Sequence, residues 1–418
     1  MSEDTPPHII IAGADPAGVF AAISAATTAP EAKVTLLAED APLPTWRNSE
    51  PFACGLTREI WDPAELAALL VAGEKELIGP FTRYGPGDFE AWLEECGQTL
   101  VINDDGRVCL ANSTTADIAN FFQAQLAKLR VNVLTKAAPR AIDIKSTGGF
   151  WLTLADERTL QADRLIVAGG GLISSAFKRI IQTDLKHSVT ELYPALTGFQ
   201  TIDDPRLRGL TETLPSHCEL RIGETDRRAA GIVRLEPWGI SGPAAWELSA
   251  QQTDYLNKLQ YRFPLRISWL TGGSRAAAKL IDEQLRQFPN GKIGALEHPQ
   301  IASRLWHNLV ATAKLKGEES WGSLTPPQRS ALVRELASGD YEVVKKKNVR
   351  GISSVLGGVA SEEIDFRTLA SRITPNLFFV GDVLNATAIS PELNLQIDWT
   401  TGWIAGAQAA GKADFECA

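Results

Sequence analysis

A short glycine-containing segment near the N-terminus has the residue types that hold phosphate groups. Residues 13–18 read Gly-Ala-Asp-Pro-Ala-Gly and follow the apolar run His8–Ala12. Glycines in such a turn let the chain reverse tightly and let a pyrophosphate approach the backbone N–H groups at the start of a helix. Gly13 suits the tight turn, and Gly18 suits close packing of that helix on the strand. The candidate ligand-binding residues of this segment are Gly13, Ala14, Asp15, Ala17 and Gly18.

Asp15 occupies the position of the second glycine in this motif, where the backbone normally meets phosphate. Its side chain adds bulk and a negative charge at that point. A carboxylate about 4 Å from a phosphate costs roughly 4 kcal/mol at an effective dielectric constant near 20. Two interpretations therefore stay open: a changed cradle that still binds a dinucleotide, or a scaffold of the same kind that has lost or changed its ligand.

Two further strand ends carry candidate residues for binding a sugar. Glu39 follows the apolar run Lys33–Ala38, where an acid takes the ribose hydroxyls in dinucleotide-binding folds; a solvated acid at a strand end would look the same. Gly381 and Asp382 end the apolar strand in PNLFFVGD. A carboxylate there either accepts hydrogen bonds from a sugar-like polyol or caps the following helix.

The segment PELNLQ places Asn394 and Gln396 near the same predicted crevice. Buried amides need hydrogen-bond partners, so these two side chains either face the crevice or satisfy the backbone of their own loop. Cys54 lies in the loop SEPFACGLT, and a lone cysteine in an apolar setting is more often inert than redox-active. The five histidines show no metal-ligand spacing, and we predict no metal site.

The elements that would position these residues lie at both ends of the chain. The first 40 residues have the order strand, glycine turn, small-residue helix and strand, which is typical of a βαβ dinucleotide-binding unit. Near the C-terminus, the strand of PNLFFVGD is followed by the small-residue helix 398–410. We therefore predict an α/β fold in which the N- and C-terminal segments form one nucleotide-binding domain around an inserted middle.

The predicted boundaries follow the changes in pattern along the chain. The split nucleotide-binding domain comprises residues 1–190 and 351–418. Residues 191–273 have the pattern of a β-rich insertion, with proline and glycine between short strands. Residues 274–350 form a predicted helical insertion, and the helical pattern itself runs from 274 to 345.

Composition limits the classes of partner and compartment. The chain has 418 residues, 44% of them apolar, and a net charge of −9, which disfavours broad binding to nucleic acid or to anionic membranes. Five scattered cysteines give no disulfide framework. The N-terminal sequence has no signal-peptide pattern, and no stretch approaches the roughly 18 apolar residues of a membrane span. We expect a cytoplasmic protein that acts on a small-molecule substrate, with no nucleic-acid or membrane partner; its oligomeric state stays open.

Several longer segments resemble the HI0933-like (YhiN/BaiN-like, aminoacetone oxidase-like) family of FAD flavoproteins. The matching segments, in chain order, are GADPAG, NDDGRV, ADRLIVAGGG, ELYPALTGF with RLRGL, WGISGPAAWELS, LGGVASEEID, TPNLFFVGDVLNA and ELNLQIDWTTGWIAG. The most specific of them are the GISGPA segment and the VGDVLNA segment with the NLQ segment that follows it. The chain departs from the family pattern at Asp15, in the shortened loop SEPFACGLT, and where PELN replaces the family's GGYN.

The resemblance implies an FAD/NAD(P)-binding Rossmann-like domain with a barrel-like β-rich insertion and a helical insertion. It implies FAD as the cofactor, and adds Cys54, Gly170 and Leu395 to the residues expected near it. It also implies an FAD-dependent oxidoreductase that transfers a hydride between the flavin and an unidentified small organic substrate. The altered glycine motif leaves two alternatives: a flavin-free relative that acts as a binding or regulatory subunit, or a chain in which Asp15 meets the ribose of another anionic ligand or a bound cation. The sequence identifies no catalytic acid or base.

Overall fold

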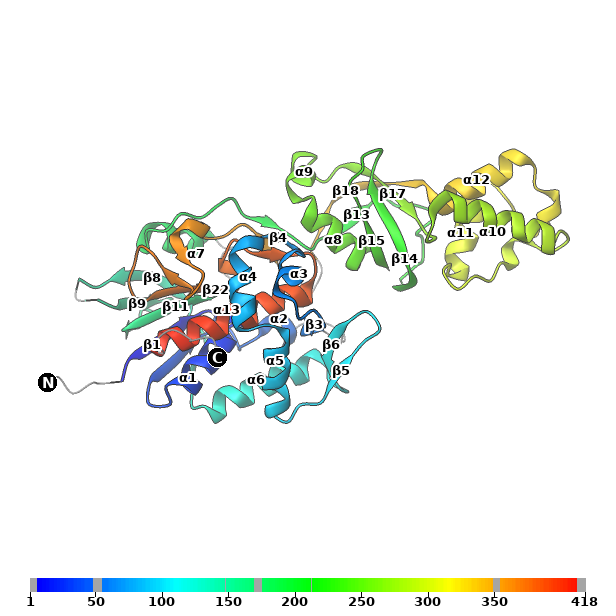
Figure 1. Cartoon of the computed structure of the whole chain (residues 1–418). Helices are drawn as coiled ribbons and strands as arrows, with labels where there is room; N and C mark the ends of the chain where they lie inside the picture. The colour runs from blue at the N-terminus through cyan, green and yellow to red at the C-terminus, as the bar shows by residue number, and fades with distance from the viewer. Residues whose placement is uncertain are drawn as a thin grey trace. The chain divides into compact units, whose positions relative to one another are not determined.

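The computed structural model describes residues 6–47, 55–146, 148–168, 175–211, 213–348 and 354–411. The chain divides into two compact units (Figure 1). Unit 1 combines Met1–Pro194 with Arg350–Ala418, and unit 2 is Ala195–Val349. The candidate residues at the two ends of the chain therefore belong to one unit, and both predicted insertions lie almost entirely in the other.

A seven-stranded sheet forms the centre of the described part of unit 1. Its strands, in spatial order, are β20 (Ile364–Asp365), β21 (Ala370–Ser371), β22 (Leu377–Val380), β11 (Arg164–Ala168), β1 (His8–Ala12), β2 (Lys33–Leu37) and β7 (Asn132–Leu134). The strands from β22 to β7 run parallel, whereas β20 and β21 add an antiparallel edge. β1, β11 and β22 are apolar and almost fully buried, as parallel strands covered on both faces are. The predicted α/β fold with a Rossmann-like domain is confirmed.

Helices and small sheets surround this central sheet. The helices of unit 1 are α1 (Pro16–Thr28), α2 (Pro44–Arg47), α3 (Pro63–Ala67), α4 (Glu74–Arg83), α5 (Pro86–Glu95), α6 (Thr115–Lys128), α7 (Ser175–Arg179) and α13 (Pro391–Ala409). The small sheets comprise β8 (Pro139–Ile144) with β9 (Phe150–Leu154) and β10 (Thr159–Ala162); β3 (Thr57–Arg58) with β5 (Leu100–Ile102) and β6 (Arg107–Leu110); β4 (Leu70–Ala72) with β23 (Thr387–Ala388); and β12 (Tyr193–Pro194) with β19 (Val355–Leu356). Among the described residues, no helix combines the length and apolar composition needed to cross a bilayer.

α1 and α13 come from opposite ends of the chain and pack along each other (Figure 1). Glycines make this close approach possible. A Cβ on Gly402 would lie 2.6 Å from the backbone oxygen of Ala17, and one on Gly406 would lie 2.4 Å from that of Ala21. The small residues of both helices therefore let the C-terminal segment complete the domain that the N-terminal segment begins.

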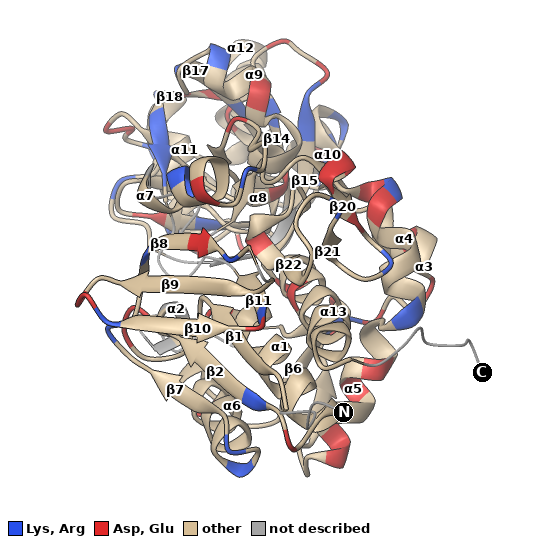
Figure 2. Ribbon diagram, turned by 90° about the vertical axis from the view of Figure 1, so that its left-hand side faces the viewer, with Lys and Arg blue, Asp and Glu red and all other residues tan. Residues whose placement is uncertain are grey.

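Unit 2 contains a closed antiparallel barrel. Its strands, in order around the barrel, are β13 (Gly198–Thr201), β16 (Gly239–Ser241), β15 (Arg228–Glu236), β14 (Thr213–Ile222), β17 (Phe263–Ser268) and β18 (Gly339–Lys347). The helices of this unit are α8 (Pro243–Gln251), α9 (Thr253–Lys258), α10 (Gly273–Gln287), α11 (Ser303–Thr312) and α12 (Pro326–Ala337). Figure 2 shows acidic and basic residues interspersed over the elements of both units.

The helical prediction for residues 274–345 is wrong at its end, because β18 begins at Gly339. β18 pairs with β13 and β17 and so closes the barrel. Its burial alternates, with Tyr341 and Val343 inside and their neighbours Asp340 and Glu342 exposed. A two-residue period of this kind is the pattern of a strand with one buried face.

Candidate functional site

The predicted site segments of unit 1 lie at the carboxyl ends of adjacent parallel strands. Gly13 follows β1, Glu39 lies two residues beyond β2, and Gly381 follows β22. Because parallel strands end at the same edge of a sheet, these residues lie at one edge, which is the usual position of a ligand crevice in open α/β sheets. Gly170 comes just after β11 in the sequence, but it lies outside the described residues, as does Cys54.

Gly13 and Gly18 leave no room for a side chain. Gly13 has a φ of +121°, and a Cβ there would lie 2.0 Å from the backbone oxygen of Ala168 at the end of β11. A Cβ on Gly18 would lie 2.0 Å from the backbone oxygen of Gly13. The turn therefore draws the start of α1 tightly against the ends of β1 and β11, which is the backbone shape of a dinucleotide cradle. A role of these glycines in binding a ligand stays a prediction.

The start of α1 presents backbone donors at this edge of the sheet. Its first helical hydrogen bond runs from the Val19 N–H to the backbone oxygen of Asp15, at 2.9 Å. The N–H groups of Ala17 and Gly18 have no partner within the described part of the chain. Asp15 is the N-cap residue, but its side chain accepts no hydrogen bond from the helix. Free N–H groups and the helix dipole favour an anion at such a position.

Three carboxyl groups gather at the same place: those of Asp15, Asp382 and Asp398. A Cβ on Gly381 would lie 2.6 Å from Oδ1 of Asp398 and 2.6 Å from the Cβ of Ala17. Asp398 on α13 therefore touches the residue just before Asp382 and lies beside the first turn of α1, next to Asp15. The sequence analysis missed Asp398. The available signal was an acid where the family pattern NLQxAW has alanine, inside a helix of small residues.

The surroundings of these carboxyl groups favour their uncharged form. Burial raises the pKa of Asp15 to about 6, and the nearby charge of Glu39, which is itself exposed, adds to the rise. Burial raises the pKa of Asp382 to about 7, with a further contribution from Asp15. Burial also raises the pKa of Asp398 well above its ordinary value, and Asp382 and Asp15 add to that shift.

No described cation compensates these three acids. Their side chains form no ion pair and no hydrogen bond with any residue that the structure describes, although each keeps partial contact with solvent. The described residues also contain no group of three or more histidines, cysteines or acids arranged to hold a metal ion. The carboxyl groups therefore repel one another when ionised, and protons are the partners that relieve this repulsion.

The cradle fits the diphosphate of a dinucleotide in shape, and in charge only while its acids are protonated. Gly13 and Gly18 give the close backbone approach, and the start of α1 gives the donors. Ionised carboxylates at the same point would oppose a phosphate, because like charges repel strongly where water is partly excluded. Protonated carboxyl groups remove that repulsion and can donate hydrogen bonds to phosphate oxygens.

Asn394 satisfies the backbone of its own loop. Its Oδ1 accepts a hydrogen bond from the Ala388 N–H at 2.9 Å, and its Nδ2 donates to the backbone oxygen of Ser390 at 2.9 Å. Leu395, the next residue, is buried. Asn394 thus fixes the turn that leads into α13. Of the two interpretations that the sequence left open for this amide, the structure shows that it satisfies the backbone of its own loop.

Gln396 is also held within the protein. Its Oε1 accepts from the Thr57 hydroxyl at 2.6 Å, and its Nε2 donates to Oγ1 of Thr400 at 3.0 Å. One turn earlier, the buried Glu392 lies 3.6 Å from Arg58 in an ion pair. These contacts tie the first turns of α13 to β3, and they leave the amide of Gln396 committed to protein partners.

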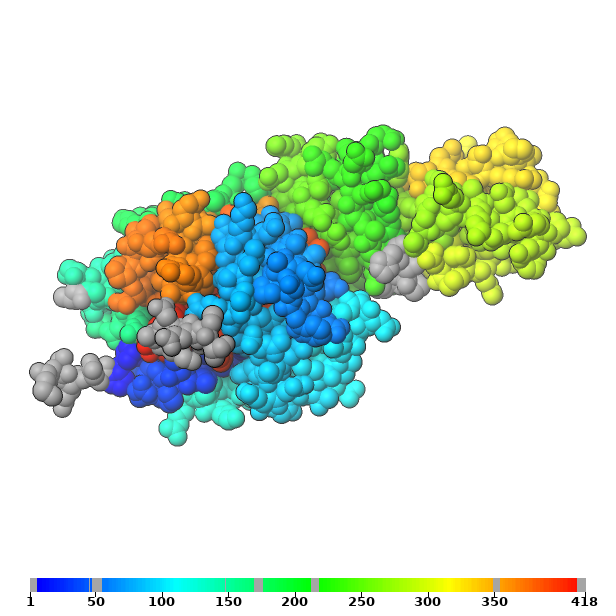
Figure 3. Space-filling view, in the orientation of Figure 1, coloured from blue at the N-terminus to red at the C-terminus, as the bar shows by residue number. Residues whose placement is uncertain are grey.

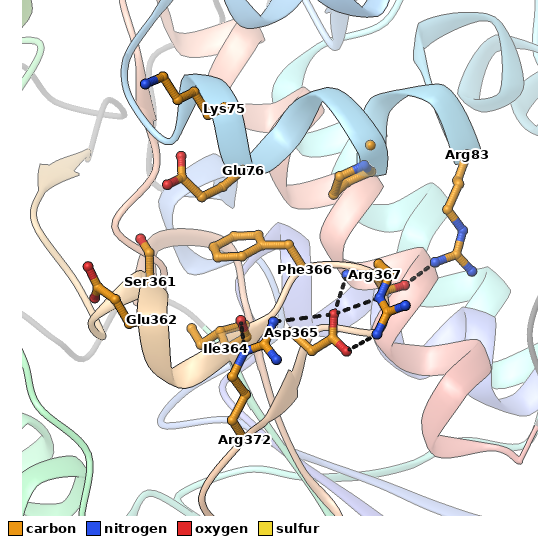
Figure 4. A pocket seen from close by; sticks show the side chains of 12 residues that line it. Lys75, Glu76, Arg83, Ser361, Glu362, Ile364, Asp365, Phe366, Arg367 and Arg372 are labelled. Atoms are coloured by element: carbon orange, nitrogen blue, oxygen red, sulfur yellow. Dashed lines mark hydrogen bonds and ion pairs between the residues drawn. The ribbon is translucent and has the colours of Figure 1, made fainter.

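A pocket of unit 1 with a volume of about 690 Å³ lies between α4 and the segment around β20 (Figure 4). Figure 3 shows these two segments side by side at the surface. The charged residues that line the pocket are Lys75, Glu76, Arg83, Glu362, Asp365, Arg367 and Arg372. Asp365 pairs with Arg367 at 3.1 Å and with Arg372 at 3.8 Å. Arg83 donates to the backbone oxygen of Arg367. Much of the charge of this pocket is therefore internally paired.

Comparison with known proteins identifies similar chains over most of the sequence. The family model described as "HI0933-like protein Rossmann domain" matches residues 7–408. A 3-dehydro-bile acid Δ(4,6)-reductase of Clostridium scindens is 21% identical, covering 97% of this chain and 99% of the relative. A ribosomal RNA dihydrouridine synthase of Escherichia coli is 26% identical, covering 66% of each chain.

A solved structure supports the fold. The 3-ketosteroid-Δ4-(5α)-dehydrogenase of Rhodococcus jostii superposes with a TM-score of 0.51 and 14% identity, covering 98% of both chains. At this identity the likeness concerns the arrangement of the elements. It shows a similar overall fold across the 98% of each chain that is covered.

Proposed function

The chain belongs to the HI0933-like family, and we propose that it is an FAD-dependent oxidoreductase that transfers a hydride between the flavin and a small organic substrate. The observation that carries the proposal is the turn between β1 and α1, where Gly13 and Gly18 leave no room for a Cβ. This turn lies at the carboxyl edge of a parallel sheet, within the family's matched region. Glycines at these two positions let the backbone N–H groups at the helix start come close to a diphosphate, which supports a dinucleotide as the ligand.

Specific residues of unit 1 would hold the cofactor. The N–H groups of Ala17 and Gly18 would donate to the diphosphate, and Glu39, exposed beyond the end of β2, would accept from the ribose hydroxyls. The bonds of Gln396 with Thr57 and Thr400 keep the start of α13 in place beside that crevice. FAD itself would supply the group that accepts or releases the hydride.

We propose a class of reaction for this chain and do not assign it a specific substrate. The names of the two curated relatives specify a bile acid and ribosomal RNA, which are unlike substrates. The net charge of −9 supports a small molecule over a nucleic acid for this chain.

The flavin content of the purified protein tests the proposal. We expect a visible flavin absorption spectrum, or its appearance when FAD is added to the colourless protein, and FAD among the small molecules released on denaturation. A protein that releases no flavin and takes up none from solution would refute the assignment.

A second candidate function is a flavin-free binding or regulatory subunit. The observation that favours it is the group of three uncompensated carboxyl groups at the start of α1, formed by Asp15, Asp382 and Asp398. Stoichiometric FAD in the purified wild-type protein would eliminate this alternative. Mass spectrometry of the released small molecules would also reveal a different ligand.

A further inference from the structure

The acids at the start of α1 have a consequence for the binding of an anionic cofactor. Asp15 is the N-cap residue, and Asp398 lies against Gly381 and Ala17, directly beside Asp382. Their surroundings contain no compensating cation within the described residues. The diphosphate of a dinucleotide would approach this same helix start.

We propose that this chain binds FAD together with protons: the diphosphate binds when Asp15 and Asp398, beside Asp382, carry protons, and their ionisation expels it. This inference rests on the proposed function, because it concerns the cofactor assigned there. It goes further by assigning to Asp15 and Asp398 of this chain a proton-linked control of cofactor binding. No covalent step is involved; each proton taken from solution neutralises one carboxylate.

The charged groups that face the three acids all act in the same direction. These groups are Asp15 in the turn before α1, Glu39 in the loop beyond β2, Asp382 after β22 and Asp398 on α13. The first turn of α1 contains no charged residue. The nearest further acid on α13, Glu392, is already paired with Arg58. A bound diphosphate adds more negative charge, so it strengthens the hold of the carboxyl groups on their protons.

This arrangement predicts the sign and size of the pH effect. A ligand that binds only the protonated form takes up protons on binding, and its dissociation constant rises with pH by about 10-fold per pH unit for each proton taken up. The pKa of Asp15, about 6, places the start of this rise below neutral pH. FAD affinity should therefore fall at least about 10-fold between pH 6 and pH 8.

The test is a titration of the flavin-free protein with FAD, followed by flavin fluorescence at several pH values. Calorimetry in two buffers with different ionisation enthalpies then counts the protons exchanged. We expect proton uptake of about one or more per FAD bound near neutral pH. FAD binding with no proton uptake and a constant dissociation constant across this range would overturn the inference.

Two variants make the test specific to these acids. Asp398→Asn keeps the shape of the side chain, and it should lower both the proton uptake and the dissociation constant at pH 8, the latter by about 10-fold. Asp104→Asn makes the same change of charge in an exposed turn between β5 and β6, and it should leave both quantities unchanged. Equal proton uptake and equal dissociation constants for the two variants would overturn the inference.

A third variant separates failure of this inference from failure of the proposed function. Asp15→Gly combined with Asp398→Ala restores the residues of the family pattern at the two positions. If this double variant and the wild-type protein both fail to bind FAD at every pH, the proposed function falls and the inference falls with it. If both bind FAD with equal affinity at pH 8, the proposed function stands and only the inference is overturned.

Discussion

Units 1 and 2 both bury charged side chains, but they do so in opposite ways. In unit 2, Arg206 lies 2.6 Å from Asp204 and 3.2 Å from Glu335, and its guanidinium lies over the ring of Tyr341 at 3.8 Å. In unit 1, the acids at the start of α1 have no described cation near them. Paired buried charges fix a structure, whereas unpaired ones mark a place where a ligand or a proton is expected.

The largest expected effect comes from removing the pairing in unit 2. Arg206→Ala leaves the buried Asp204 without its cation and leaves Glu335 only the exposed Arg334, at 3.9 Å. Loss of one partner of a buried ion pair typically costs about 3–5 kcal/mol. We expect the free energy of unfolding of unit 2 to fall by that amount, measured by denaturant titration with tryptophan fluorescence. Arg208→Ala is the matched control, because Arg208 pairs with Asp203 on the exposed surface. A similar loss of unfolding free energy in both variants would show that the buried ion pairs contribute no more to stability than the exposed one.

The pH dependence of stability should reveal the unpaired acids of unit 1. The pKa values of Asp15 and Asp382 are raised in the folded state, so the folded chain holds protons that the unfolded chain releases. The stabilisation is complete below about pH 4 and disappears as the pH rises through about 6 and 7. We expect the flavin-free protein to lose about 3 kcal/mol of unfolding free energy between pH 5 and pH 8, measured by urea unfolding.

A triple variant provides the comparison for this pH effect. Replacing Asp15, Asp382 and Asp398 by asparagine removes the titrating groups and should flatten the dependence between pH 5 and pH 8. The remaining acidic surface is the same in both proteins. An equal slope for wild type and triple variant would show that the three acids do not control stability in this range.

Asp398→Asn alone should produce a smaller effect with an unusual sign. Burial and the neighbouring acids raise the pKa of Asp398, so its ionisation at pH 8 opposes folding. The amide removes that cost, and we expect the variant to be more stable than the wild type at pH 8, with a smaller gain at pH 5 because the cost grows with pH above the unfolded pKa. Differential scanning calorimetry at the two pH values would measure it. Lower stability of the variant at pH 8 would indicate that the carboxylate has a favourable partner.

The backbone of the cradle could be predicted from the sequence because its signals are local. An apolar strand, Gly13, Gly18 and a run of small residues lie within one short segment, and the structure gives both glycines contacts that exclude a Cβ. The same holds for the strand that ends at Gly381. The contacts themselves come from distant segments, since Gly13 meets Ala168 and Gly381 meets Ala17 and Asp398, but the glycine motifs that predict them are local.

The charge of the site could not be predicted in the same way. Asp398 reaches Gly381 and Ala17 only because α13 packs along α1, and that contact joins the two ends of the chain. The amide of Gln396 bonds to Thr57 of β3, and that of Asn394 bonds to Ala388 of β23; composition does not place either strand beside α13. β18 was missed for a related reason: its alternation follows a long helical segment, and its strand partners β13 and β17 precede that segment.

The smallest expected effect compares two acids of unit 1 with opposite surroundings. Asp365 lies 3.1 Å from Arg367, and hydrogen bonds from this arginine lower the pKa of Asp365, with Arg372 contributing further. Its carboxylate therefore stabilises the fold above its unfolded pKa, and this contribution disappears as the pH falls through about 4 and below. Asp365→Asn should cost about 0.5–1 kcal/mol at pH 8, because Arg367 is largely exposed and water screens the pair.

The same change from aspartate to asparagine would then stabilise the protein at Asp398 and destabilise it at Asp365. Calorimetry of both variants at pH 8 measures the two signs side by side. Shifts of the same sign would show that the presence or absence of a cation is not what distinguishes the two acids.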